Sequence, residues 1–164
     1  MNEYEECIFE ALRWLIQFDR ELIETQPKEE CINHRLAQYL ENVLSQRNLL
    51  NDCRVDIEYN KYKEDEKKTS DGRNIRPDII AHERRSGNRN NLIVIEAKKG
   101  YDVKTDRDKV TDLVNSKDYQ YSVGAVISYL PQKEYLKIKL LKRQGVWKKY
   151  RMNKNDFEIQ ETKR

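Results

Sequence analysis

The chain begins with two stretches in which apolar residues recur every three or four positions, the spacing of an amphipathic helix. In the first stretch, residues 1–26, Asn2 is followed three positions later by Glu5, which predicts a capped helix start. The second stretch, residues 28–48, follows Pro27 and carries its own apolar stripe. The pattern therefore predicts two helices before any strand.

The period changes from helical to alternating near residue 53, and most of the remaining chain is predicted to form strands. Between the first two strands, the charged segment 60–74 is predicted to be a solvent-exposed loop. Continuous β-branched runs further along predict strands that are covered on both faces. The predicted strands are 54–59, 75–82, 92–95, 121–128, 136–141 and 146–152, with a helix at 105–118 capped by Thr105.

The order of these elements predicts the fold class. Strand, helix and strand across 92–128 imply a right-handed crossover and therefore a parallel pair of strands. The last two strands predict a hairpin within 133–153, and the tail after Asn153 is expected to fray. We predict an α/β protein in which helices flank a central mixed β-sheet in three layers, within one domain of residues 1–164.

The composition says more about where in the cell the protein is expected than about which reaction it catalyses. A net charge of +3 is too small to identify a nucleic-acid-binding protein by itself. Cys7, Cys31 and Cys53 are widely spaced and form no C-x-x-C pair, which favours free thiols over a zinc site or a disulfide framework. The start of the chain does not resemble a signal peptide, and no run has the ~18 apolar residues of a membrane span. We therefore expect a cytoplasmic protein with no membrane partner.

Two carboxylates and a lysine at the ends of two predicted strands carry the strongest chemical signal. Asp78 follows Pro77, and Glu96 ends an apolar run two positions before Lys98. Residues two apart on a strand share a face, so Glu96 and Lys98 are expected side by side and Lys99 on the opposite face. Buried carboxylates are costly unless a charge compensates them, and a divalent cation supplies that charge.

The runs Arg76–Ile80 (RPDII) and Leu92–Lys98 (LIVIEAK), set in this order of elements, resemble the PD-(D/E)xK nuclease superfamily, which has the restriction-endonuclease-like fold. The resemblance covers residues 28–130 and leaves the first helix, 1–26, and the hairpin, 133–153, outside the family core. It implies a stand-alone nuclease that hydrolyses phosphodiester bonds of DNA with Mg²⁺ or Mn²⁺, in defence or in repair.

The resemblance also implies roles for individual residues. Asp78, Glu96 and the backbone carbonyl of Ala97 would bind the metal ion, and Lys98 would hold or polarise the attacking water. Relatives often add an acid from the helix before the first strand, and Glu30 is favoured for this position. This assignment is less specific than the core motif, because Glu29 is adjacent and Glu41 fits nearly as well. The accessory candidates are His34, Glu41 and Glu58, and Lys104 or Lys109 could contact phosphate.

Basic residues outside this motif are candidates for contacts with nucleic acid. The stretch 133–154 interleaves lysines with Trp147 and Tyr150, which favours either a phosphate-binding surface or an edge hairpin whose lysines prevent aggregation. The candidate contacts are Arg84, Arg85, Lys104, Lys148 and Lys149. Two alternative functions stay open: an inactive module of the same fold that binds nucleic acid or a protein partner, and a ribonuclease. The oligomeric state also stays open, and a homodimer is one candidate.

Overall fold

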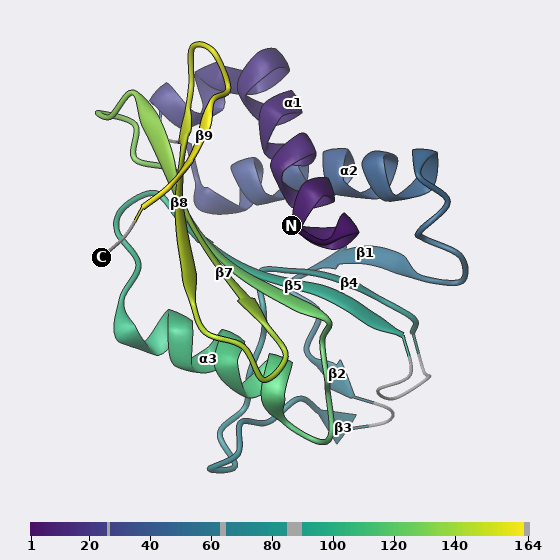
Figure 1. Ribbon diagram of the computed structural model, residues 1–164. Helices are drawn as coiled ribbons and strands as arrows, with labels where there is room; N and C mark the ends of the chain where they lie inside the picture. Colours follow the sequence, from purple (N-terminus) through teal and green to yellow (C-terminus); the bar gives the residue numbers. More distant parts are fainter. Residues whose placement is uncertain (26, 63–64, 85–89, 163–164) are drawn as a thin grey trace.

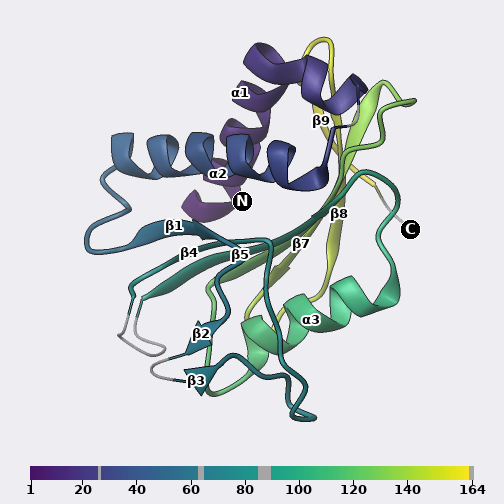
Figure 2. The same cartoon turned by 180° about the vertical axis from the view of Figure 1, so that it is seen from behind.

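The computed structural model describes residues 1–25, 27–62, 65–84 and 90–162. Two helices cover one face of a central sheet and a third helix covers the other, so the predicted three layers are present (Figures 1 and 2). The helices are α1 (Glu3–Thr25), α2 (Glu29–Gln46) and α3 (Lys104–Asn115). The strands are β1 (Arg54–Ile57), β2 (Lys61–Tyr62), β3 (Asp65–Glu66), β4 (Ile79–His82), β5 (Asn91–Lys98), β6 (Val123–Ser128), β7 (Tyr135–Lys142), β8 (Lys148–Asn153) and β9 (Ile159–Glu161).

The start of α1 has the predicted capping box. The Glu5 N–H donates to Asn2 Oδ1 at 2.9 Å, and the Asn2 N–H donates to Glu5 Oε2 at 2.7 Å. The helix kinks at Asp19, where φ is −134°. There the Asp19 carboxylate accepts a hydrogen bond from Arg35 of α2 at 2.8 Å, so the kink is tied to the neighbouring helix.

The main sheet has seven strands in the order β1-β4-β5-β6-β7-β8-β9. Only β5 and β6 run parallel, joined through α3, and the other pairs are antiparallel. The sheet is therefore mixed, as predicted. In the β4–β5 pair, Ile79 lies opposite Ile95 and Ile80 opposite Val94. This register determines which groups meet where the two strands end.

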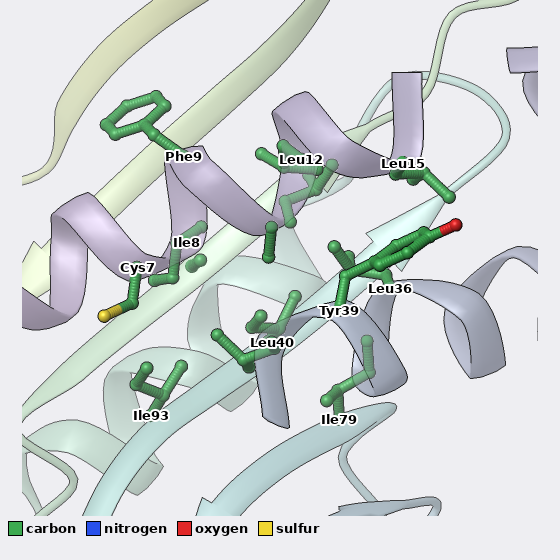
Figure 3. Close-up of a cluster of buried hydrophobic side chains, with 14 of the residues drawn as sticks. Cys7, Ile8, Phe9, Leu12, Leu15, Leu36, Tyr39, Leu40, Ile79 and Ile93 are labelled. Carbon is green, nitrogen blue, oxygen red and sulfur yellow. The ribbon is translucent and has the colours of Figure 1, made fainter. Parts of the chain in front are cut away.

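Each face of the sheet carries its own apolar core. Under α1 and α2, side chains such as Leu12, Leu40 and Ile93 form one cluster (Figure 3). Val94 points to the other face, where it packs with Val110 and Val114 of α3. Residues one apart on β5 thus enter different cores, which explains why this strand is apolar at every position from Leu92 to Ile95.

The structure departs from the prediction at four places. The strand predicted at 75–82 begins only at Ile79, so Asp78 lies just before it. The tail does not fray, because β9 pairs with β8 and Ile159 lies opposite Met152. The segment 60–74 is not only loop, since β2 and β3 form a small antiparallel pair within it. At the start of α3, the Val103 N–H donates to Asp106 Oδ2 at 2.9 Å, so Asp106 rather than the exposed Thr105 caps this helix.

Candidate functional site

Asp78 and Glu96 face each other where β4 begins and β5 ends. Continuing the register past Ile79 and Ile95 brings Asp78 directly opposite Glu96, and opposite residues on neighbouring strands share a face. The Ala97 N–H donates to Asp78 Oδ2 at 2.8 Å and fixes this carboxylate. Ala97 therefore contacts the site through its N–H, and the role that the resemblance gives to its carbonyl stays a prediction.

Glu96 is the most buried acid of the site, with 2% of the residue exposed. Its Oε2 accepts a hydrogen bond from Lys109 Nζ of α3 at 2.6 Å. Its Oε1 is buried and has no hydrogen-bond partner among the described residues. A buried oxygen without a partner is costly, and such atoms are commonly found where a ligand or ion binds.

Burial raises the pKa of both carboxyl groups. The pKa of Glu96 rises to about 8, first because burial disfavours its charge and then because Asp78 is nearby, although Lys109 opposes the shift. Burial likewise raises the pKa of Asp78 to about 6, and the hydrogen bond from Ala97 opposes that shift. Two acids whose charged forms are both disfavoured would gain from a bound cation.

Lys98 lies beside this pair and is held by α3. Its Nζ is 3.1 Å from Oδ1 of Asp106, the same buried carboxylate whose other oxygen caps the helix. Asp106 raises the pKa of Lys98, and Glu29 and Glu96 add to the effect, so the ammonium is charged at neutral pH. The contacts of Lys98 and Glu96 with one helix place both side chains on the α3 face of the sheet.

The acid that α2 contributes is Glu29 rather than Glu30. Glu29 Oε2 accepts a hydrogen bond from the Lys99 N–H at 3.0 Å, and its charge acts on both Asp78 and Lys98. Glu30 is exposed, because one helical position turns a side chain by about 100°. Lys99 points to the α2 side, where its Nζ donates to the Pro27 carbonyl at 3.0 Å. Of these two adjacent lysines, Lys98 is therefore the one on the site face.

Three predicted accessory groups lie elsewhere. His34 and Glu41 line a groove between α2 and the edge strand β1, together with Val55 and Ile57. The backbone of Glu58 lies beside that of Asp78, because the Glu58 N–H donates to the Asp78 carbonyl at 2.9 Å. Its carboxylate, however, points to Arg76 at 3.5 Å, and both side chains are largely exposed.

Most of the basic residues predicted to touch nucleic acid are separated from the site or from one another. Arg84 pairs with Asp56, and Arg85 lies outside the described residues. Lys104 is exposed at the first position of α3. Lys148 and Lys149 are neighbours on β8 and therefore point to opposite faces of the sheet.

The site thus contains more charged groups than the motif alone indicates. Asp106 was missed, because Val103 is not one of the residue types that mark a helix N-cap in a sequence, and the helix was predicted to begin two residues later. Lys109, one of two candidates for a phosphate contact, donates a hydrogen bond to Glu96. The carboxylates of the site are Asp78, Glu96, Asp106 and Glu29, and its ammonium groups are Lys98 and Lys109. When all six groups are ionised, the four negative and two positive charges leave two negative charges, which a divalent cation would neutralise.

The donor set decides which cation could bind. Within the described residues, no group of three or more His, Cys, Asp and Glu side chains is placed to hold a metal ion. A site for Zn²⁺, which takes three or four protein ligands, is therefore not formed by these residues. Mg²⁺ binds through one or two carboxylates and completes its shell with water and substrate phosphate oxygens. Asp78 and Glu96, with the unpartnered Oε1, fit that requirement.

No protein-family model matches the chain, and no curated protein sequence matches it either. In the described part of the chain, no helix has both the length and the apolar character needed to cross a bilayer. The geometry of the site is therefore the basis for assigning a function.

Proposed function

We propose that this protein is a Mg²⁺-dependent phosphodiesterase that cuts DNA. The observation that carries the proposal is the buried Glu96, which has one carboxylate oxygen without a partner and lies opposite Asp78. A buried carboxylate oxygen without a protein partner needs a water or a cation, and a second carboxylate beside it favours the cation. Lys98 adds a fixed positive charge on the same face, which suits a phosphate substrate.

Asp78 and Glu96 would hold the cation between the ends of β4 and β5. When bound, Mg²⁺ supplies positive charge that offsets the negative charge developing on the phosphate. Because their pKa values are raised, the two acids become good ligands only as they lose their protons. Cation binding should therefore release protons and strengthen as the pH rises from about 6 to about 8.

Lys98 would act through its charge and not as a base. Its raised pKa keeps the ammonium protonated, so it can donate hydrogen bonds to the attacking water or to a phosphate oxygen. Asp106 orients this ammonium and is itself fixed by the Val103 N–H, which makes it a positioning residue. Lys109 neutralises Glu96 through Oε2 and leaves Oε1 for the cation.

Nicking of supercoiled plasmid DNA tests the proposal. The wild-type protein should nick the plasmid in Mg²⁺ or Mn²⁺ and not in chelator. Glu96→Gln and Lys98→Ala should each lower the rate at least about 100-fold, since each removes one charge that acts in the transition state. Lys148→Ala, a lysine on the opposite face of the sheet from Lys98, is the matched control and should cut at the wild-type rate.

Other results would assign the fold a different role. Binding of DNA without cutting in either metal would support an inactive module. Cutting of RNA but not of DNA under the same conditions would support a ribonuclease. Cutting that survives Glu96→Gln would show that the activity does not come from this site.

A further inference from the structure

A row of paired residues leads from Lys98 across four more strands on one face of the sheet. Lys98 lies opposite Ser128, Ser128 opposite Lys137, Lys137 opposite Arg151, and Arg151 opposite Gln160. Residues paired in this way share a face, and Lys98 faces α3. The row contains no acid, so beyond the site it presents only positive or neutral side chains.

This part of the sheet face lies beyond the helix that covers the rest. α3 packs chiefly against β5 and β6, and β7 and β8 continue past it (Figure 1). On β7, Leu136 and Ile138 enter the core under α1 and α2, while Lys137 points the other way. Arg151 of β8 is exposed. Since β9 pairs with the outer side of β8, these cations do not protect a bare sheet edge.

Lys137 and Arg151, which we call the basic patch, each have an aromatic ring beside them. Lys137 Nζ is 5.3 Å from the ring centre of Tyr101, and the Arg151 guanidinium is 4.6 Å from that of Tyr135. Tyr101 is 55% exposed, which leaves much of its surface open to a ligand. Rings beside cations are the arrangement by which proteins stack unpaired bases and bind the phosphates that connect them.

The loop that carries Tyr101 is held at both sides of the ring. The side chain of Asp102, next to Tyr101, is buried and pairs with Lys139 of β7 at 2.6 Å and with Arg107 of α3. Lys99, two positions before Tyr101, is hydrogen-bonded to Pro27 and Glu29. The Asp102 carboxylate therefore points into the protein, whereas the Tyr101 ring lies on the surface and its backbone is fixed. A preorganised ring loses little conformational freedom when it binds a ligand.

We propose that Tyr101, Lys137 and Arg151 form a binding surface for a single-stranded DNA segment, with a base stacked on Tyr101 and phosphates on the two cations. The inference deepens the proposed function, because it names unpaired DNA as the substrate form. Lys98 and Lys137 are two strand spacings apart, roughly 10 Å, so one strand can reach both the patch and the site. Paired bases in a duplex are stacked inside the helix and do not offer a face to Tyr101.

Fluorescence anisotropy in chelator, with a labelled oligo-dT and a labelled duplex of equal length, tests the surface without cutting. Tyr101→Ala should weaken oligo-dT binding about 5- to 100-fold, the loss of one base–aromatic stack, and change duplex binding less than about 2-fold. Tyr101→Phe keeps the ring and should bind like the wild type. Lys137→Ala should weaken binding and reduce the salt slope by about 0.7, whereas Lys148→Ala on the opposite face should change neither.

Equal affinity of Tyr101→Ala and wild type for oligo-dT would overturn the inference, and so would equal losses for oligo-dT and duplex. The proposed function fails separately, if neither plasmid nor single-stranded DNA is cut in Mg²⁺ or Mn²⁺, or if Glu96→Gln still cuts them. Because binding is measured without metal, the stacking surface can stand when the nuclease fails and can fail when the nuclease stands.

Discussion

Removing the charge of Glu96 should stabilise the metal-free protein at alkaline pH. In the folded state, burial raises the pKa of this carboxyl from 4.5 to about 8, so the fold retains a proton that the unfolded chain releases. A group whose pKa rises on folding costs stability as the pH increases from its unfolded value to its folded value. The wild-type protein should therefore lose stability between about pH 5 and about pH 8, while Glu96→Gln has no such proton to lose.

The size of the effect follows from the shift. At 1.36 kcal/mol per pKa unit, the change from 4.5 to about 8 sets an upper limit of about 5 kcal/mol. Water that enters the site when Glu96 ionises reduces this cost, and we expect about 2–3 kcal/mol. The Glu96→Gln protein should gain this much over the wild type as the pH rises. Saturating Mg²⁺ should return part of the lost stability to the wild type only, because it binds the ionised carboxylates.

Urea unfolding at several pH values in chelator measures the difference directly. Glu30→Gln is the matched control, since Glu30 is exposed on α2 and should show no pH-dependent gain. A difference between Glu96→Gln and wild type that is constant from about pH 5 to about pH 8 would refute the reasoning. It would mean that Glu96 ionises in the folded protein as easily as in the unfolded chain.

Three further predictions test the fold and the site. Gly124→Ala should cost about 1–3 kcal/mol of unfolding free energy in urea, because an added Cβ would clash with Val110 and lie 2.7 Å from Val114 of α3, whereas Gly100→Ala has open space and should cost nothing. Ending the chain after Asn155 should lower the unfolding free energy by about 2–4 kcal/mol, since β9 and the packing of Phe157 and Ile159 are lost; an unchanged melting curve would mean that β9 contributes no stability. Asp106→Asn should lower kcat about 10- to 100-fold. It should also move the alkaline limb of the pH–rate profile to lower pH, because Asp106 raises the pKa of Lys98. An alkaline limb that does not move would contradict the positioning role of Asp106.

The main elements of the fold could be predicted because hydrophobic spacing determines them locally. The change of period near residue 53 separates the helices from the sheet, and the continuous run of β5 reflects a strand buried on both faces. The β9 strand was missed because Ile159–Glu161 has only three residues and no alternating pattern of its own. Its stability comes from pairing with β8, which is a tertiary effect.

For the candidate site, the sequence indicated the groups that lie on strands better than those that lie on helices. The two-residue period places Glu96 and Lys98 on one face and Lys99 on the other, and the contacts with α3 and α2 agree. The choice between Glu29 and Glu30 depends on how α2 is rotated against the sheet, which local spacing does not determine. Asp106 reaches Lys98 only because α3 packs beside β5, so its part in the site needed the tertiary structure.

The most direct test of the account is anomalous diffraction from a crystal soaked in Mn²⁺ at a pH above the raised pKa of Glu96. An anomalous peak is expected within coordinating distance of both the Asp78 and the Glu96 carboxylates, with Glu96 Oε1 as a ligand. A crystal with Mn²⁺ in the solvent, no peak between these two residues and Lys109 still bonded to Glu96 would contradict it.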